Sequence, residues 1–228
     1  MSKVFLVEDD PTIRENIRTA LNKWQYEVII VQDWNQVVSE IMAARVDLVL
    51  MDITLPVFDG FYWTEELRKQ SQIPIIFISS ADMNPNAVRA IATGADDYVT
   101  KPFVLDVLTS KVQAILRRVN QYNPTDNSVL DFDGSTLSTL TNELSYGEAT
   151  VKLTPTEGYI LQLLILNLNQ IVSKTKIMRM LWQGGAFIDE DVLNTNISRL
   201  RSKMKTVDLP DRIITERGQG YRLVENDS

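Results

Sequence analysis

The stretch Leu48-Val49-Leu50-Met51-Asp52-Ile53-Thr54-Leu55-Pro56 decides how the first half of this chain folds. Residues 48–51 are consecutive apolar side chains, a pattern typical of a strand buried on both faces of a parallel sheet. The run stops at Asp52, which places a carboxylate at the carboxyl edge of that sheet, where open α/β folds bind ligands. A lone aspartate at a strand end is also an ordinary turn residue, so its meaning depends on which other groups converge on it.

The composition indicates a globular protein. The 228 residues are 44% hydrophobic and 23% charged, which suits two domains of about 100–120 residues each. No apolar run approaches the roughly 18 residues that a membrane span needs, and acids follow the N-terminus too closely for a signal peptide. We therefore expect a cytoplasmic protein without membrane insertion.

The chain contains no cysteine and no histidine. This excludes disulfides, thiolate zinc sites and thiol catalysis, together with the usual general base and the usual transition-metal ligand. Carboxylate, hydroxyl and amine chemistry remains. Oxygen ligands of this kind favour a hard cation such as Mg²⁺.

Short apolar strands alternate with amphipathic helices through the first half of the chain. We expect strands at residues 4–7, 28–31, 48–51, 75–78 and 98–99, and helices at residues 13–24, 37–42, 61–69, 86–93 and 105–118. Five strands alternating with helices predict an α/β fold, a five-stranded, doubly wound parallel sheet.

Polar side chains follow the ends of four of these strands. Glu8 and Asp9 follow the first, Asp52 ends the third, Ser79 follows the fourth and Lys101 follows the fifth. Parallel strands end at one edge of a sheet, so these groups can share one crevice. Two carboxylates about 4 Å apart repel by about 4 kcal/mol at an effective dielectric of about 20, so three acids predict a cation between them.

At this point the sequence resembles the receiver domain of bacterial response regulators. The motifs that carry the resemblance are Glu8-Asp9, Asp52 with Pro56, Asp59-Gly60, Ser79 and Asp96-Asp97-Tyr98-Val99-Thr100-Lys101-Pro102-Phe103. The resemblance implies a flavodoxin/CheY-like receiver over residues 1–118, in which Asp52 is the phosphoacceptor. The resemblance also implies that the phosphoryl donor is a phosphohistidine on a cognate sensor histidine kinase. Because this chain has no histidine, the donor has to be a partner protein or a small phosphodonor.

The resemblance also implies further roles in the same crevice. Mg²⁺ is held by Asp9, Asp52 and the backbone carbonyl of Thr54, and Glu8 acts on it through a water molecule. Lys101 adds a point charge, the Ser79 hydroxyl hydrogen-bonds the new phosphoryl oxygen, and Tyr98 then turns inward. Judged without their neighbours, Tyr98 is as readily a core side chain and Lys101 a solvated loop residue.

The family dimerises through its fourth helix, fifth strand and fifth helix. Asp96, Asp97 and Lys111 are the expected members of cross-subunit ion pairs. Another family pair position carries Ala87 and Val107, which are both apolar, so an apolar contact can replace that ion pair. We expect a homodimer that phosphorylation strengthens.

The second half reads as a different domain. Residues 119–127 are a polar linker with a proline, and residues 129–153 form short strands of a small antiparallel sheet. Thr154-Pro155-Thr156-Glu157 starts a helix with an N-cap, a proline at the first position and a capping-box glutamate. A second helix at 173–182, a third at 192–204 and two strands at 213–223 complete this half.

This order resembles the α+β winged helix-turn-helix effector domain of OmpR/PhoB-type regulators, over residues 128–225. The motifs are Asn196-Ile197-Ser198-Arg199-Leu200-Arg201 in the third helix and Arg217-Gly218-Gln219-Gly220-Tyr221-Arg222 at the wing. The net charge of −7 argues against indiscriminate nucleic-acid binding, but residues 194–207 contain only basic charges. The expected DNA contacts are Asn194, Asn196, Ser198, Arg199, Arg201, Lys203, Arg217 and Arg222.

The leading hypothesis is a phosphorylation-activated transcription factor, not an enzyme, that binds double-stranded promoter DNA and acts with RNA polymerase. The residues around 178–190 resemble regulators of cell-envelope stress and peptide-antibiotic resistance. One alternative is a phosphatase with Asp52 as nucleophile, which Thr54 disfavours because it stands where a general acid would be. Another is a DNA-binding protein with a pseudo-receiver that is not phosphorylated.

Overall fold

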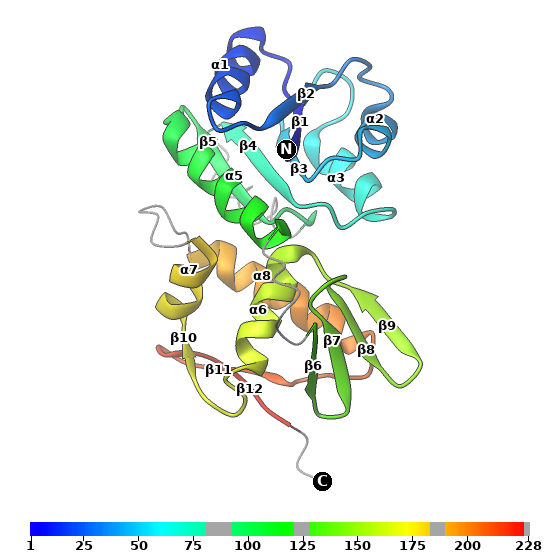
Figure 1. Cartoon of the computed structure of the whole chain (residues 1–228), viewed down its shortest axis with the longest axis vertical. Helices are drawn as coiled ribbons and strands as arrows, with labels where there is room; N and C mark the ends of the chain where they lie inside the picture. The colour runs from blue at the N-terminus through cyan, green and yellow to red at the C-terminus, as the bar shows by residue number, and fades with distance from the viewer. Residues whose placement is uncertain (81–92, 121–127, 183–189, 226–228) are drawn as a thin grey trace. The chain divides into compact units, whose positions relative to one another are not determined.

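The computed structural model describes residues 1–80, 93–120, 128–182 and 190–225. The chain separates into two compact units, Met1–Arg117 and Arg118–Ser228. Each unit builds its own sheets and buries its own apolar side chains (Figure 1). A search of the described helices for one long and apolar enough to cross a membrane finds none.

The first unit contains a five-stranded sheet in which every neighbouring pair is parallel. The strands are β1 (Lys3–Val7), β2 (Glu27–Ile30), β3 (Leu48–Asp52), β4 (Ile75–Ser80) and β5 (Asp97–Lys101), in the order β2-β1-β3-β4-β5. All residues of β3 are buried, because the strand is central in the sheet and covered on both faces. The parallel sheet expected from the sequence is confirmed.

Helices cover both faces of this sheet (Figure 1). On one face lie α1 (Pro11–Asn22) and α5 (Leu105–Asn120), and on the other lie α2 (Val37–Ala44) and α3 (Gly60–Arg68). Successive side chains of β3 alternate between the two cores: Leu48 and Leu50 pack with α1 and α5, whereas Val49 and Met51 pack with α2 and α3. The helix expected at residues 86–93 lies almost wholly outside the described residues.

The second unit contains two sheets. The first is antiparallel, in the order β6-β7-β8-β9, and consists of β6 (Val129–Phe132), β7 (Ser135–Ser138), β8 (Glu143–Tyr146) and β9 (Ala149–Lys152). The second has the order β10-β12-β11 and consists of β10 (Val172–Ser173), β11 (Ile213–Glu216) and β12 (Gly220–Leu223). Strand β10 was not expected, because two residues are too short to show an alternating pattern.

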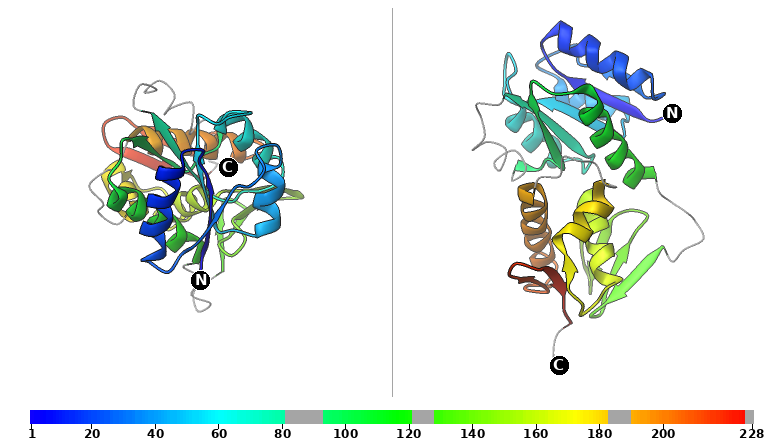
Figure 2. Two further views of the ribbon diagram at one scale, coloured as in Figure 1. Left: turned by 90° about the horizontal axis from the view of Figure 1, so that it is seen from above. Right: turned by 90° about the vertical axis from the view of Figure 1, so that its left-hand side faces the viewer.

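The described residues of the second unit also form three helices: α6 (Pro155–Ile165), α7 (Lys174–Trp182) and α8 (Glu190–Lys205). Helix α6 packs against both of the others, and Figure 2 shows the β11–β12 hairpin, in red, beside them. The capping box at the start of α6 is confirmed, since Glu157 N donates to Thr154 Oγ1 and Thr154 N donates to Glu157 Oε2. The winged helix-turn-helix architecture is therefore confirmed. Most of the expected linker lies outside the described residues.

Candidate functional site

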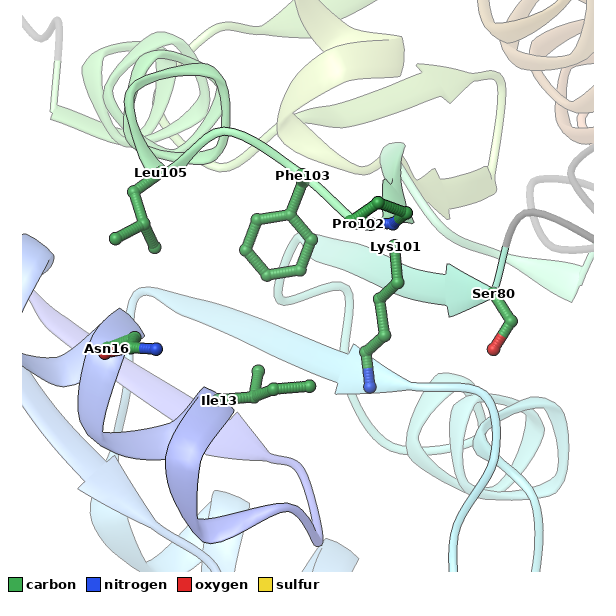
Figure 3. Close-up of a pocket in the computed structure, with 7 residues that line it drawn as sticks. All are labelled: Ile13, Asn16, Ser80, Lys101, Pro102, Phe103 and Leu105. Carbon is green, nitrogen blue, oxygen red and sulfur yellow. The ribbon is translucent and has the colours of Figure 1, made fainter.

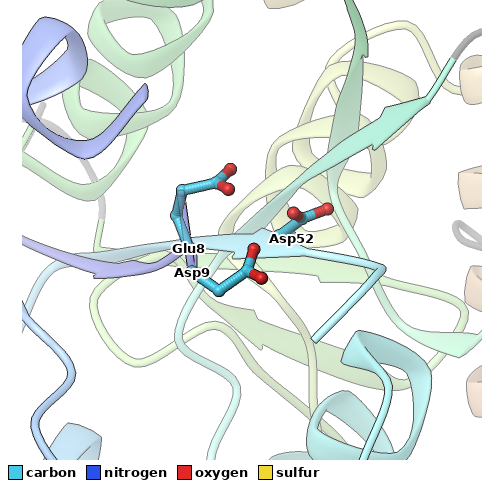
Figure 4. A group of neighbouring side chains, drawn as sticks. All are labelled: Glu8, Asp9 and Asp52. Carbon is cyan, nitrogen blue, oxygen red and sulfur yellow. The ribbon is translucent and has the colours of Figure 1, made fainter. Parts of the chain in front are cut away.

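Three carboxylates meet at the carboxyl edge of the parallel sheet (Figure 4). Glu8 and Asp9 directly follow β1, and Asp52 ends β3, which pairs with β1 in register from Val4 to Val7. One oxygen from each of the three carboxylates lies within 4.8 Å of the others. Glu8 is completely buried and Asp52 is nearly so, whereas Asp9 is exposed.

Lys101 enters the same cluster from the end of β5. Its Nζ lies 2.8 Å from Asp52 Oδ2 and 2.8 Å from Glu8 Oε2. Burial works to lower the pKa of Lys101, but its hydrogen bonds to Asp52 and Glu8 outweigh this and raise the pKa above its ordinary value. Lys101 is therefore a fixed positive charge beside Asp52.

Burial raises the pKa of Glu8 from 4.5 to about 7, and the neighbouring Asp52 carboxylate adds to the effect against the opposing influence of Lys101. Repulsion between Glu8 and Asp52 indicates a need for more positive charge than one lysine supplies. The donor atoms are all hard oxygens, and one oxygen from each of the three carboxylates lies within 4.8 Å of the others, a spacing that suits ligands of one small cation. The residues thus fit Mg²⁺.

The segment after Asp52 is held close to the cluster. Thr54 N donates to Asp52 Oδ1 over 3.2 Å, and Gly60 N donates to the carbonyl of Ile53 over 2.9 Å. Asp59 caps α3 by accepting from Tyr62 N at 2.8 Å. A Cβ at Gly60 would lie 2.2 Å from the Asp52 carbonyl oxygen, so only glycine lets α3 begin here.

The switch candidates lie on the neighbouring strands. Ser79 is nearly buried on β4, one residue beyond Ile78, which pairs with Asp52 across the sheet. Tyr98 is half-buried on β5 and packs against the core beneath α2 and α3. The sheet register therefore brings Ser79 to the edge that carries Asp52, whereas Tyr98 stands nearer the start of β5.

A pocket of about 610 Å³ opens beside Lys101 (Figure 3). Its lining comes from α1 and from the segment around the end of β5: Ile13, Asn16, Ser80, Lys101, Pro102, Phe103 and Leu105. The sequence pattern Lys101-Pro102-Phe103 points to this region, but the contribution of Ile13 and Asn16 depends on how α1 packs.

The expected dimer residues form ion pairs within the chain instead. Lys111 Nζ lies 2.8 and 2.9 Å from the two carboxylate oxygens of Asp97, and Arg68 Nη2 lies 3.3 Å from Asp96 Oδ2. Both aspartates are completely buried, because the start of β5 is covered by the end of α3 and by α5. In this single chain the three side chains are engaged within the first unit, and their place in cross-subunit ion pairs stays a prediction.

The polar residues of α8 also need correction. Asn196 was an expected DNA contact, but it is completely buried and its Nδ2 donates to the carbonyl of Val192 over 2.9 Å. Arg199 and Lys203 contact the two carboxylate oxygens of buried Glu157, at 2.8 and 2.7 Å. The sequence predicts the place of Glu157 in the capping box but not its contacts with these two cations.

The remaining expected DNA contacts lie on α8 or in the wing. Arg201 donates to the carbonyl of Ile213 over 2.9 and 2.7 Å, and Tyr221 OH donates to Asn194 Oδ1 over 2.7 Å. Arg222 pairs with Glu216 within the hairpin. Ser198 on α8 and Arg217 at the wing are exposed, so the structure brings one helix and one hairpin together as a candidate DNA interface.

Comparison with protein families divides the chain in the same way. Residues 4–113 match the family described as "Response regulator receiver domain", and residues 147–223 match "Transcriptional regulatory protein, C terminal". The first match covers the acidic cluster, and the second covers α6, α7, α8 and the wing.

Individual proteins are similar over the full length. The chain is 39% identical over 227 residues to sensory transduction protein BceR of Bacillus subtilis, covering 100% of this chain and 98% of that one. It is 36% identical over 219 residues to response regulator protein GraR of Staphylococcus epidermidis, covering 96% and 98%. The crystal structure of response regulator DrrB, described as a Thermotoga maritima OmpR/PhoB homologue, shares the fold with a TM-score of 0.51 and 22% identity, covering 98% and 99%.

Full-length identity of 39% and the two family matches show that this chain belongs to the OmpR/PhoB-type two-component response regulators, which are phosphorylation-activated, DNA-binding transcription factors.

Proposed function

We propose that Asp52 accepts a phosphoryl group from a phosphohistidine on a cognate sensor histidine kinase, and that this switches binding to promoter DNA. The observation that carries the proposal is the meeting of Glu8, Asp9, Asp52 and Lys101 at one sheet edge. Three acids and one lysine in contact are an arrangement that a structural role alone does not require.

The chemistry is a transfer between two nucleophiles. A carboxylate oxygen of Asp52 forms a bond to phosphorus while the bond from phosphorus to the kinase imidazole breaks, and the departing nitrogen keeps the electron pair. Lys101 neutralises charge on the phosphoryl oxygens, since its Nζ already lies beside Asp52. The pocket lined by Phe103 and Ile13 gives a partner side chain access to this lysine.

Mg²⁺ bound by Glu8, Asp9, Asp52 and the Thr54 carbonyl would neutralise the charge of the transferring phosphoryl group. Asp9 is the exposed carboxylate of the set, so it meets an incoming cation first. Glu8 is completely buried, so it contributes its carboxylate from the interior side of the cluster.

Ser79 and Tyr98 carry the signal away from Asp52 in this proposal. The Ser79 hydroxyl moves to hydrogen-bond the phosphoryl oxygen, and Tyr98 turns into the space that it leaves. Ser79 lies on β4 and Tyr98 on β5, and these neighbouring strands pair in parallel, which supports the coupling between the two side chains.

The test is phosphorylation of the purified full-length chain by acetyl phosphate with Mg²⁺. We expect the wild type to gain one phosphoryl group by intact mass and Asp52→Asn to gain none. Asp9→Asn is the matched control for a metal ligand, and it should slow labelling without removing the acceptor. Labelling of Asp52→Asn equal to the wild type would contradict the proposal, and absence of labelling in the wild type would favour a pseudo-receiver.

Turnover of a small phosphoester is not part of the proposed function. A phosphatase using Asp52 as nucleophile would need a general acid nearby, and the position two residues on is Thr54, whose hydroxyl is a poor acid. The proposed cycle therefore ends at the phosphorylated aspartate, and the output is DNA binding.

We propose a cytoplasmic regulator that forms a homodimer on phosphorylation, binds direct-repeat promoter DNA and acts on RNA polymerase. Its domains are residues 1–118 and 128–225, with a linker at 119–127. The resemblance around residues 178–190 favours a regulator of responses to cell-envelope stress or peptide antibiotics.

A further inference from the structure

Helix α8 has four distinct sides. Successive residues of an α-helix are rotated by about 100°, so residues three and four apart share a side. The side buried in the domain consists of Val192, Leu193, Asn196, Ile197, Leu200 and Met204. The remaining polar residues of α8 lie on two flanks and on an outer side.

One flank faces α6 and carries Arg199 and Lys203. Arg199 Nη2 lies 2.8 Å from Glu157 Oε1, and Lys203 Nζ lies 2.7 Å from Glu157 Oε2. Glu157 is completely buried, whereas the side chains of Arg199 and Lys203 are only 14% and 22% exposed. Lys203 also donates to the carbonyl of Lys152 over 2.9 Å.

These contacts hold the Arg199 and Lys203 side chains against the protein and away from a DNA partner. A buried carboxylate is costly without cations, so turning Arg199 or Lys203 toward DNA would expose Glu157 to a large desolvation penalty. Glu157 is itself fixed by the capping box, because Thr154 N donates to Glu157 Oε2 over 2.8 Å. The contacts of Arg199 and Lys203 with Glu157 therefore set the rotation of α8 about its own axis relative to α6.

The opposite flank faces the wing. Tyr221 OH donates to Asn194 Oδ1, and the Arg201 guanidinium bonds the carbonyl of Ile213 and lies 5.8 Å from the Tyr221 ring centroid. Asn194 and Arg201 are thus tied to the hairpin that follows α8. With both flanks held, a single outer side remains for a partner.

The outer side carries Asp191 in the first turn of α8 and then an outer stripe of Thr195, Ser198, Ser202 and Lys205, spaced three or four residues apart. Ser198, Ser202 and Lys205 are exposed and Thr195 is half-buried. Thr195 Oγ1 and Ser202 Oγ donate to the carbonyls of Asp191 and Ser198 over 2.8 and 3.0 Å, so these two hydroxyls present acceptor oxygens to DNA donors. Hydroxyl groups hydrogen-bond base edges and phosphates, the threonine methyl can contact thymine, and lysine binds phosphate. We propose that this stripe contacts the DNA, and that Arg199 and Lys203 are positioning residues that act through Glu157. The inference rests on the proposed DNA-binding function and reassigns residues within it.

The experiment first uses the full-length, phosphorylated wild type to select duplexes from random DNA. Variants are then titrated with the selected duplex, with each of its single-base-pair variants and with an unrelated duplex. Arg199→Gln should weaken binding to every duplex by the same factor, and Arg199→Lys, which keeps a cation near Glu157, should restore most of the affinity. Ser198→Ala should change discrimination at one base pair by about fivefold or more.

Salt dependence provides a matched comparison between two lysines of the same helix. Lys205→Gln should lower the slope of log affinity against log salt by about 1, because one phosphate contact is lost. Lys203→Gln should lower the affinity and leave that slope unchanged. Urea unfolding of each variant identifies any loss of affinity that comes from an unfolded fraction.

Three results would overturn the inference. They are loss of discrimination at one base pair in Arg199→Gln, equal loss of salt slope in both lysine variants, and unchanged discrimination in the alanine variants of Thr195, Ser198 and Ser202. If the wild type selects no sequence, the proposed function fails as well. If it does select one and Arg199 carries the discrimination, only this inference fails.

Discussion

At the scale of single residues, the protonation state of Glu8 determines the net charge of the acidic cluster near neutral pH. Burial holds the pKa of Glu8 at about 7, well above the 4.5 of a free glutamate. In the absence of a cation, this group contributes its stability below about 4.5 and loses it as the pH rises through about 7, because the folded state then buries a charge. A cation reverses the preference, since it requires the ionised carboxylate.

We therefore predict that Mg²⁺ affinity increases as the pH rises through about 7, with release of protons on binding. Calorimetric titrations in two buffers of different ionisation enthalpy would measure both quantities. Glu8→Gln is the control, because it removes the titrating group and should make the affinity nearly independent of pH. Equal wild-type affinity on both sides of neutrality would show that Glu8 does not take part.

At the scale of elements, the site depends on how closely α3 approaches the end of β3. The first residue of α3 is Gly60, and a Cβ there would lie 2.2 Å from the Asp52 carbonyl oxygen and 3.1 Å from Ile53 Cα. These are backbone atoms and cannot rotate away as a side chain could. The glycine of the Asp59-Gly60 motif is thus a packing requirement of the site.

Gly60→Ala should lower the free energy of unfolding of the first unit by about 1–3 kcal/mol, the usual cost of overpacking. This occurs although alanine is the better helix former, by up to about 1 kcal/mol. Urea unfolding followed by tryptophan fluorescence would measure the change. Gly147→Ala, at a position with φ +58° in the second unit, is the control and should leave the first unit unchanged. An unchanged or increased stability of Gly60→Ala would contradict this account of α3.

The ion pair between Asp97 and Lys111 ties α5 to β5. Both carboxylate oxygens of Asp97 contact Lys111 Nζ, and the pair is buried. Lys111→Met should destabilise the first unit by about 3–5 kcal/mol, because a buried carboxylate loses its cation. The double variant Asp97→Asn/Lys111→Met should recover much of this loss in the same unfolding measurement. A loss below about 1 kcal/mol in the single variant would place the pair among weak, solvent-screened contacts.

At the scale of the whole molecule, the chain is acidic, with a net charge of −7, and several of its basic side chains form ion pairs with buried carboxylates. Asp96 and Asp97 are buried in intrachain pairs with Arg68 and Lys111. A dimer through the face formed by β5 and α5 therefore has to use other contacts or rearrange these pairs. The apolar Val107 on α5 is available for the first route.

We predict that a beryllofluoride mimic of the phosphoryl group doubles the sedimenting mass of the full-length chain. The mimic should act through Asp52, Ser79 and Tyr98 on the face that contains β5, so Asp52→Asn should remain at its original mass under the same conditions. If the wild type sediments at the same mass with and without the mimic, phosphorylation does not drive dimerisation.

The sequence alone determined the parallel sheet, the strand ends that meet at Asp52 and the capped start of α6. These features can be predicted locally, because strand periodicity, the alternation of strands with helices and capping chemistry each depend on residues that are close together in the sequence. The same rules placed Glu8, Asp9, Asp52 and Lys101 at one edge, since every parallel strand ends there.

Only the tertiary structure decided which partners the long polar side chains choose. Arg199 and Lys203 lie at the border between the buried and exposed sides of α8, from which a flexible cation reaches either solvent or a neighbouring helix. The buried Glu157, 46 residues away from Lys203 in sequence, decides in favour of the protein. Asp97 and Lys111 pair within the chain for the same reason: the free energy of a buried charge depends on what packs around it, which no local pattern records.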